Sequence, residues 1–161
     1  MAKRSAGILM YRRRDGRTEV LLVHPGGPFW AKKDAGAWSI PKGEYTDGKD
    51  PRTEALREFE EELGRPAPDG AAILDLGEIK QRSGKVVTAF AVEGDLDPSD
   101  VNSNTFEMEW PPRSGRIQVF PEIDRVEWFG VGEARERLKA AQVPFLERLE
   151  SALGQRVGEG S

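Results

Sequence analysis

The 161-residue sequence contains no cysteine and a single histidine, His24. Without cysteine the chain can form no disulfide, no thiolate metal site and no cysteine nucleophile. A histidine-based triad would rest on His24 alone, and a metal centre built from several histidines is excluded.

Long apolar runs and a strong charge bias are also missing. The N-terminal apolar run, Gly7 to Tyr11, is too short for a signal peptide or a membrane span, so we expect a cytoplasmic protein without a membrane partner. A net charge of −4 gives no general attraction to nucleic acid, so no stable nucleic-acid partner is expected. The length suits one domain, which we place at residues 3–153, with 154–161 as a disordered tail.

The stretch from residue 41 to residue 65 organises the chain. Asp50 is a good N-cap, and Pro51 suits the first helical position because its missing N–H would be unpaired there. Gly64, followed by Pro66, is typical of a helix end. These signals predict a helix over 51–63.

This helix would have an apolar stripe and an acidic face. The periodicity places Leu56, Phe59 and Leu63 on one stripe. On the opposite face it places the carboxylates of Glu58, Glu61 and Glu62. Such a face is often only a solvated surface, but inside a cleft its mutual repulsion favours binding of a divalent cation.

The same residues resemble the Nudix box, G-x5-E-x7-R-E-U-x-E-E-x-G-U, in which U is a bulky apolar residue. The matching positions are Gly43, Arg57, Glu58, Phe59, Glu61, Glu62 and Gly64. Lys49 replaces the first glutamate and Arg65 replaces the last apolar residue. In the family that glutamate usually partners the box arginine, so another carboxylate must brace Arg57 here; the candidates are Asp47, Asp50 and Glu54.

A phosphate-binding loop competes for part of this stretch. Residues 43–49 satisfy G-x-x-x-x-G-K, the first part of a P-loop. Asp50 stands where a Ser or Thr hydroxyl should reach magnesium, and Pro51 removes an N–H that should contact phosphate. We therefore favour the Nudix interpretation.

The resemblance implies an α+β fold, a Nudix-type α/β/α sandwich with a mixed β-sheet between helices. It also implies hydrolysis of a phosphoanhydride bond in a nucleoside diphosphate derivative. Mg²⁺ or Mn²⁺ would be bound by Glu58, Glu61 and Glu62, with Arg57 positioning a carboxylate. We expect Glu122 to be the base that activates water; its rivals are Glu107, Glu109 and Glu127.

The long loop 24–36, HPGGPFWAKKDAG, is expected to select the substrate. Its aromatic rings could stack on a base while its lysines attract phosphate, although the rings could equally pin the loop to the body. Beyond it, Trp38 and then Pro41-Lys42-Gly43 resemble the Nudix subgroup that hydrolyses diadenosine polyphosphates, and also inositol-pyrophosphate hydrolases. The predicted substrate-binding residues are His24, Trp30, Lys32, Lys33 and Lys42.

We expect the substrate to be a small-molecule nucleotide, either a dinucleoside polyphosphate or an NTP. An inositol-pyrophosphate hydrolase and a non-hydrolytic nucleotide-binding module with this fold are the alternatives. A homodimer is one oligomeric state that we consider.

The remaining elements follow from alternation and turn residues. Strand hairpins are predicted at 5–12 with 19–24 and at 73–81 with 85–93, where 85–93 should be central because both of its faces are apolar. The other predicted elements are strands at 38–40, 105–110, 117–120 and 125–129, a linker at 65–70, and helices at 133–142 and 144–153.

Overall fold

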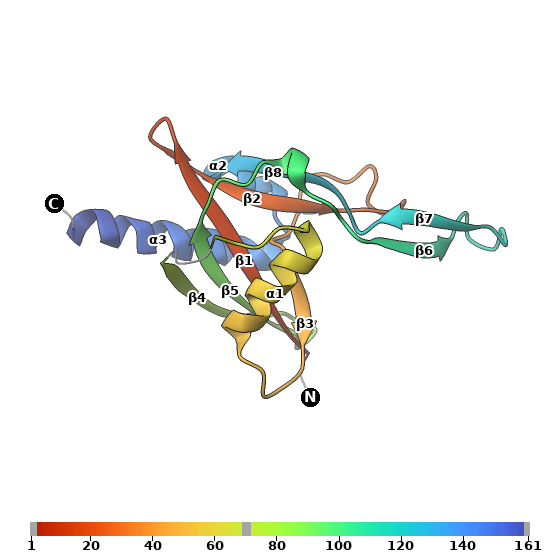
Figure 1. Cartoon of the computed structure of the whole chain (residues 1–161), viewed down its shortest axis with the longest axis horizontal. Helices are drawn as coiled ribbons and strands as arrows, with labels where there is room; N and C mark the ends of the chain where they lie inside the picture. The colour runs from red at the N-terminus through yellow and green to blue at the C-terminus, as the bar shows by residue number, and fades with distance from the viewer. Residues whose placement is uncertain (1–2, 69–71, 160–161) are drawn as a thin grey trace.

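The computed structural model describes residues 3–68 and 72–159. A mixed six-stranded sheet lies between helices on its two faces (Figure 1). Its strands follow the order β4-β5-β1-β2-β8, and β3 also pairs with β1. β1 and β5 are parallel, whereas the other neighbours are antiparallel. The predicted α+β class and the α/β/α sandwich with a mixed sheet are confirmed.

The elements have the following bounds. The strands are β1 (Arg4–Arg14), β2 (Arg17–Pro25), β3 (Lys42–Tyr45), β4 (Ile73–Lys80), β5 (Val86–Glu93), β6 (Thr105–Glu109), β7 (Ile117–Pro121) and β8 (Ile123–Gly130). The helices are α1 (Pro51–Leu63), α2 (Val131–Arg137) and α3 (Val143–Glu159).

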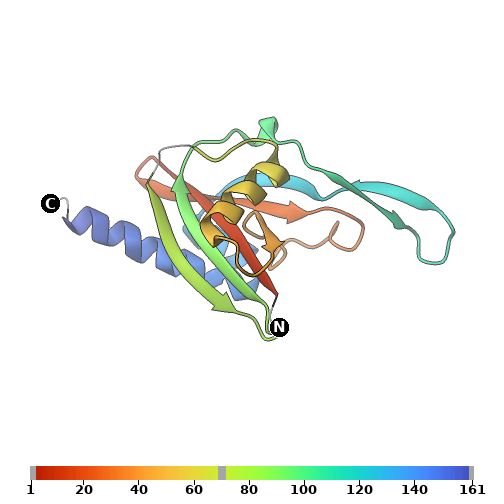
Figure 2. The same cartoon turned by 60° about the horizontal axis from the view of Figure 1, so that its bottom comes forward.

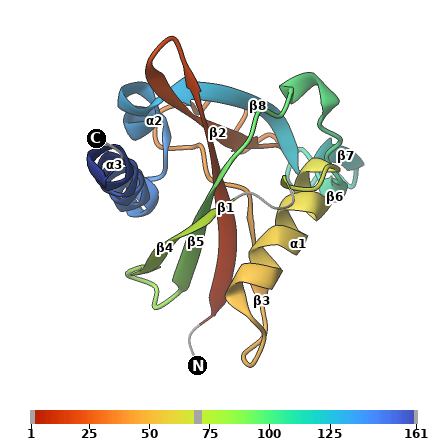
Figure 3. The same ribbon diagram turned by 60° about the vertical axis from the view of Figure 1, so that its left-hand side comes forward.

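The side chains of β1 alternate between two cores, one on each face of the sheet. Ile8 and Met10 pack in the core under α1, while Leu9 and Tyr11 pack in the core on the α2 and α3 side. Figure 3 shows α1 on one face of the sheet and α3 on the other. Because β1 is buried on both faces, it fixes the two layers of helices relative to each other.

Both predicted caps of α1 are present. The backbone N–H of Thr53 donates to Oδ2 of Asp50 at 3.2 Å. Gly64 adopts the left-handed conformation with φ of 73°, and its N–H donates to the carbonyl of Glu60 at 2.8 Å. Glycine suits this position because it has no Cβ to clash there. The predicted bounds of the helix are confirmed.

The buried stripe of α1 is rotated from the predicted one. Ala55, Phe59 and Leu63 are buried, whereas Leu56 is only half-buried. The prediction that the three glutamates share the face opposite the apolar stripe is wrong for Glu62, which lies beside the buried stripe, one turn beyond Glu58 and two turns beyond Ala55. Glu58 and Glu62 are half-buried, and Glu61 is exposed.

The strand predicted at 38–40 is wrong. Trp38 and Ser39 form only isolated bridges, with Leu138 and Val23. The strand lies later, at β3, and pairs with β1 in the register Gly7 opposite Lys42. Because residues 43–45 belong to this strand, they cannot wrap a phosphate, so the P-loop interpretation is also excluded.

The C-terminal helices differ from their predicted bounds. α2 ends at Arg137, and a 3-10 turn at Ala140–Gln142 leads into α3. α3 continues to Glu159, so the tail predicted from residue 154 is helical that far. The end of the tail, 160–161, and the end of the predicted linker, 69–70, lie outside the described residues.

β6 and β7 form a two-stranded sheet of their own. This hairpin, here called the arm, extends away from the rest of the molecule (Figure 2). The chain enters the arm after α1 and β5 and returns from it directly into β8. Among the described residues, no helix has the length and apolarity needed to cross a membrane.

Candidate active site

Gly43 allows α1 to lie close to β3. A Cβ at this position would collide with the carboxylate of Glu58, so the absence of a side chain on β3 creates the space in which Glu58 lies. The next contact is made by backbone: the N–H of Lys42 donates to Oε2 of Glu62 at 3.1 Å. Two of the predicted ligands are thus placed against the same short strand.

Glu62 is the most perturbed carboxylate of this region. Burial raises its pKa to about 8, against an ordinary value of 4.5. The hydrogen bond from the Lys42 backbone and the Lys42 ammonium oppose this shift, while repulsion from Glu58 and Glu122 adds to it. A carboxyl group that resists ionisation beside two others is a place where a cation would be strongly favoured.

The other two predicted ligands differ from Glu62 and from each other. Burial is the main cause that raises the pKa of Glu58, with the nearby Arg57 charge opposing it. Glu61 is exposed at the surface. Nη2 of Arg57 lies 2.8 Å from Oε1 of Glu58, and its Nη1 lies 2.7 Å from Oε1 of Glu61.

Glu54 braces Arg57 in place of the residue that Lys49 replaces. Its Oε2 accepts hydrogen bonds from Nε and Nη2 of Arg57 at 2.9 and 2.6 Å. The other two candidates are used elsewhere: Asp47 pairs with Arg4 at 3.2 Å, and Asp50 caps α1. Of the three alternatives that the sequence left open, the structure selects Glu54.

The oxygen-rich composition of this region fits a hard divalent cation, because its donors are carboxylates without thiolate or accessible imidazole. Across residues 3–68 and 72–159, no three His, Asp or Glu side chains are gathered as a ready-made metal site. Arg57 contacts both Glu58 and Glu61 in this arrangement, whereas Glu62 accepts a hydrogen bond from the backbone of Lys42.

Glu122 lies in the link between β7 and β8, and its backbone N–H donates to the carbonyl of Asn104 at 2.8 Å. Its charge contributes to the raised pKa of Glu62, so the link brings this distant glutamate toward α1. The rivals lie on other elements: Glu107 and Glu109 are on the arm, and Glu127 is within β8.

Lys42 is the centre of a lysine cluster with Lys85 and Lys139. Burial lowers the pKa of Lys42, and the charges of Lys85 and Lys139 lower it further. Because Gly43 faces Glu58, the alternation of β3 directs Lys42 toward the other face of the sheet. No local pattern of residues pointed to Lys85 and Lys139, since only folding brings them to Lys42.

Trp30 lies beside this cluster. It is half-buried and packs against the core on the α2 and α3 side. Nζ of Lys33 and Nζ of Lys139 each lie 5.2 Å from the centroid of its ring. Both properties predicted for the loop, an anchored ring and a ring next to positive charge, are therefore found in one residue. Lys32, by contrast, is exposed.

The prediction that His24 binds substrate is wrong. Its side chain is completely buried. Nδ1 lies 2.7 Å from Oδ1 of Asp124, and Nε2 lies 2.6 Å from the carbonyl of Lys33. With both nitrogens occupied inside the protein, His24 ties loop 24–36 to β8 instead of contacting a ligand.

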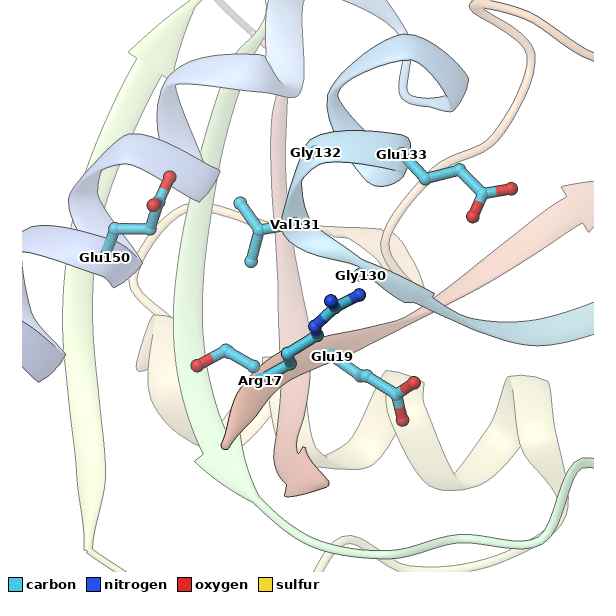
Figure 4. Close-up of a pocket in the computed structure, with 8 residues that line it drawn as sticks. Arg17, Glu19, Gly130, Val131, Gly132, Glu133 and Glu150 are labelled. Carbon is cyan, nitrogen blue, oxygen red and sulfur yellow. The ribbon is translucent and has the colours of Figure 1, made fainter. Parts of the chain in front are cut away.

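A separate cavity of about 610 Å³ lies near the turn of the β1–β2 hairpin (Figure 4). It is lined by Arg17, Thr18, Glu19, Gly130, Val131, Gly132, Glu133 and Glu150. None of these residues belongs to α1 or β3, and the three glutamates pair with Arg12, Arg137 and Arg135. This cavity is therefore not the site built around Glu62.

Comparison with known proteins identifies the arrangement. The model of the NUDIX domain matches residues 1–149. Among solved structures, the fold is similar to a binary complex of a C. elegans Ap4A hydrolase, with a TM-score of 0.63 and 20% identity over 94% of this chain and 98% of that chain. It is also similar to the NUDIX domain of Shewanella oneidensis NrtR complexed with ADP ribose (TM-score 0.62, 15% identity, 95% and 89% coverage). A mutT/nudix family protein from Listeria innocua gives a TM-score of 0.62 at 16% identity, with 96% of each chain covered.

Proposed function

The chain belongs to the Nudix family, and from this premise we propose that it is a pyrophosphohydrolase that cleaves a phosphoanhydride bond in a dinucleoside polyphosphate or an NTP. The observation that carries the proposal is the half-buried carboxyl group of Glu62, which lies against the backbone of Lys42 and whose pKa is raised to about 8, chiefly by burial and in part by repulsion from Glu58 and Glu122. A site that concentrates acidic groups in this way is suited to cation-dependent chemistry on a polyanion.

Nudix proteins generally use divalent metal ions. Glu58, Glu61 and Glu62 are the residues that would hold Mg²⁺ or Mn²⁺ here. A bound divalent cation shields phosphate oxygens and lowers the pKa of an attacking water. Arg57 contacts one oxygen, Oε1, of Glu58 and of Glu61, and Glu54 holds Arg57 in place through its own two hydrogen bonds.

Glu122 is assigned as the base that removes a proton from the attacking water. Its backbone is held between β7 and β8 by the hydrogen bond to Asn104, and its charge contributes to the raised pKa of Glu62. A base must reach the proton that it abstracts, either directly or through one water. This requirement favours Glu122 over Glu107 and Glu109, which lie on the arm.

The lysine cluster is assigned to the phosphate chain of the substrate. Lys42 connects the carboxylates to the lysine cluster, because its N–H holds Glu62 while its side chain lies with Lys85 and Lys139. Trp30, next to Lys139, would offer its ring to a base. The Ap4A hydrolase and the ADP ribose complex among the similar structures agree with a nucleotide ligand.

An inositol pyrophosphate is the second candidate substrate, and the same lysine cluster favours it because that ligand is densely phosphorylated and has no base. Trp30 is the residue that distinguishes the two candidate substrates. Stacking on a nucleobase requires the ring, whereas an inositol pyrophosphate would depend on Lys42, Lys85 and Lys139 alone.

The test is a panel of diadenosine polyphosphates, NTPs, nucleotide sugars and inositol pyrophosphates, assayed with Mg²⁺, with Mn²⁺ and with EDTA. We expect phosphate or a nucleoside phosphate to be released from a dinucleoside polyphosphate or an NTP, and only with the cation. Glu122→Gln should abolish this turnover, and the matched variant Glu107→Gln should retain it. Binding without any product from the whole panel would show a nucleotide-binding module instead of an enzyme.

A further inference from the structure

The arm exposes apolar side chains that a monomer leaves in water. Ile117 and Val119 on β7 are 62% and 59% exposed, and Phe29 of loop 24–36, whose ring contacts Trp110, is 61% exposed. These are the large apolar side chains that stand out to solvent in the described part of the chain. Figures 1 and 2 show that the arm extends away from the body. A hairpin of two strands is only marginally stable in water, so a further strand would stabilise it.

The backbone of β7 has an open edge with a defined pattern. The N–H of Trp110 donates to the carbonyl of Arg116 at 2.9 Å, and the N–H of Glu122 donates to the carbonyl of Asn104 at 2.8 Å. Antiparallel pairs alternate between hydrogen-bonded and non-hydrogen-bonded. Counting along the register from these two hydrogen-bonded pairs, Ile117 and Val119 fall in non-hydrogen-bonded pairs. Their N–H and C=O groups therefore point away from β6, toward the open edge.

Charge distinguishes the two edges of the arm. If two copies paired through β6 around Met108, Glu107 would lie opposite Glu109 of the other copy, and like charges directly opposite each other are destabilising. If two copies paired through β7 around Gln118, Ile117 of each copy would lie opposite Val119 of the other. The β7 edge is therefore complementary to itself, and the β6 edge is protected against such pairing.

We propose that β7 is a dimerisation strand that pairs antiparallel with β7 of a second copy of this chain, centred on Gln118. The four strands form one continuous sheet with the order β6-β7-β7-β6 across the two copies. Ile117 and Val119 make the hydrogen-bonded pairs, and their side chains form one apolar patch on the sheet. Because the two β7 strands run antiparallel, the two bodies lie at opposite ends of this sheet.

A single cysteine tests the register, since the natural chain has none. Gln118 would lie opposite its own copy in a non-hydrogen-bonded pair, about 4.5 Å apart at Cα, which lies within the range of a disulfide. In mild oxidant, full-length Gln118→Cys should form a covalent dimer at least about tenfold faster than Thr105→Cys, an exposed position on β6. Equal rates would overturn the proposal.

Paired charges test the interface in a second way. Ile117→Lys/Val119→Lys and Ile117→Glu/Val119→Glu place like charges opposite each other, so each should sediment as a monomer. Mixing the two should restore a dimer, because every lysine then lies opposite a glutamate. Circular dichroism of each variant checks that the fold is kept. A wild-type chain that stays monomeric as its concentration rises, or a mixture that stays monomeric, would contradict the proposal, as would a dimer that persists in either charged variant alone.

Discussion

The backbone N–H of Lys42 donates to Oε2 of Glu62 at 3.1 Å and thereby joins the edge of β3 to the end of α1. This bond holds a carboxyl group that burial otherwise makes reluctant to ionise. It depends on the backbone of Lys42 and not on its side chain. The position of Glu62 and the charge of Lys42 can therefore be tested separately.

Glu62→Gln should lower kcat by about two orders of magnitude or more, because the amide cannot supply the negative charge that a divalent cation requires. The amide oxygen can still accept the N–H of Lys42, so the fold should be kept. Glu60→Gln is the matched control, since it makes the same chemical change at an exposed position of α1. Steady-state kinetics with circular dichroism measures both. A kcat near that of the wild type would remove Glu62 from the site.

The stability of the metal-free protein should fall as the pH rises from about 4.5 to about 8. The folded chain holds the Glu62 proton up to about pH 8, whereas the unfolded chain releases it near 4.5, so between these values folding takes up a proton and becomes less favourable. Thermal unfolding in EDTA measures this trend. It should be weaker in Glu62→Gln and unchanged in Glu60→Gln.

Added Mg²⁺ should stabilise the wild type more at pH 8 than at pH 5, because the cation binds the ionised carboxylate. The same thermal unfolding series measures this difference. Stabilisation that does not depend on pH would show that the cation binds elsewhere.

Glu54→Ala should reduce kcat by about 10–100-fold with little change in KM, because Arg57 loses the group that fixes its orientation.

Lys49→Glu restores the usual box residue and should be tolerated, with a change in stability of about 0–1 kcal/mol, as for an exposed pair. Kinetics and chemical denaturation of both variants provide the measurement. If Lys49→Glu eliminated activity, Lys49 would have to contact the substrate.

Trp30→Ala should weaken substrate binding by about 1–3 kcal/mol, seen mainly in KM, if its ring stacks on a base. Trp30→Phe keeps a ring and is the matched control. Lys33→Ala should raise KM more for long polyphosphates than for short ones, and Lys32→Ala should do the same. A lower melting temperature with an unchanged KM would instead identify Trp30 as a packing residue of loop 24–36.

Local signals in the sequence determined the central helix and most of the strands. Asp50 and Gly64 define the ends of α1 because capping involves only neighbouring backbone groups. The hairpin of β1 and β2 follows from Asp15-Gly16, both at positive φ, between two apolar runs. The spacing of the Nudix box is likewise local, and for this reason the family could be predicted from the residues alone.

The tertiary structure decided how the site residues differ from one another. Glu58, Glu61 and Glu62 look alike in the sequence, yet packing against β3 leaves Glu62 half-buried, with a raised pKa, while Glu61 stays exposed. The burial of His24, the choice of Glu54 as the partner of Arg57, the lysine cluster and the separate arm were also decided by folding. Each depends on segments that are far apart in the chain or on a choice between competing neighbours, and burial and charge at such places are set by the packing of the whole molecule.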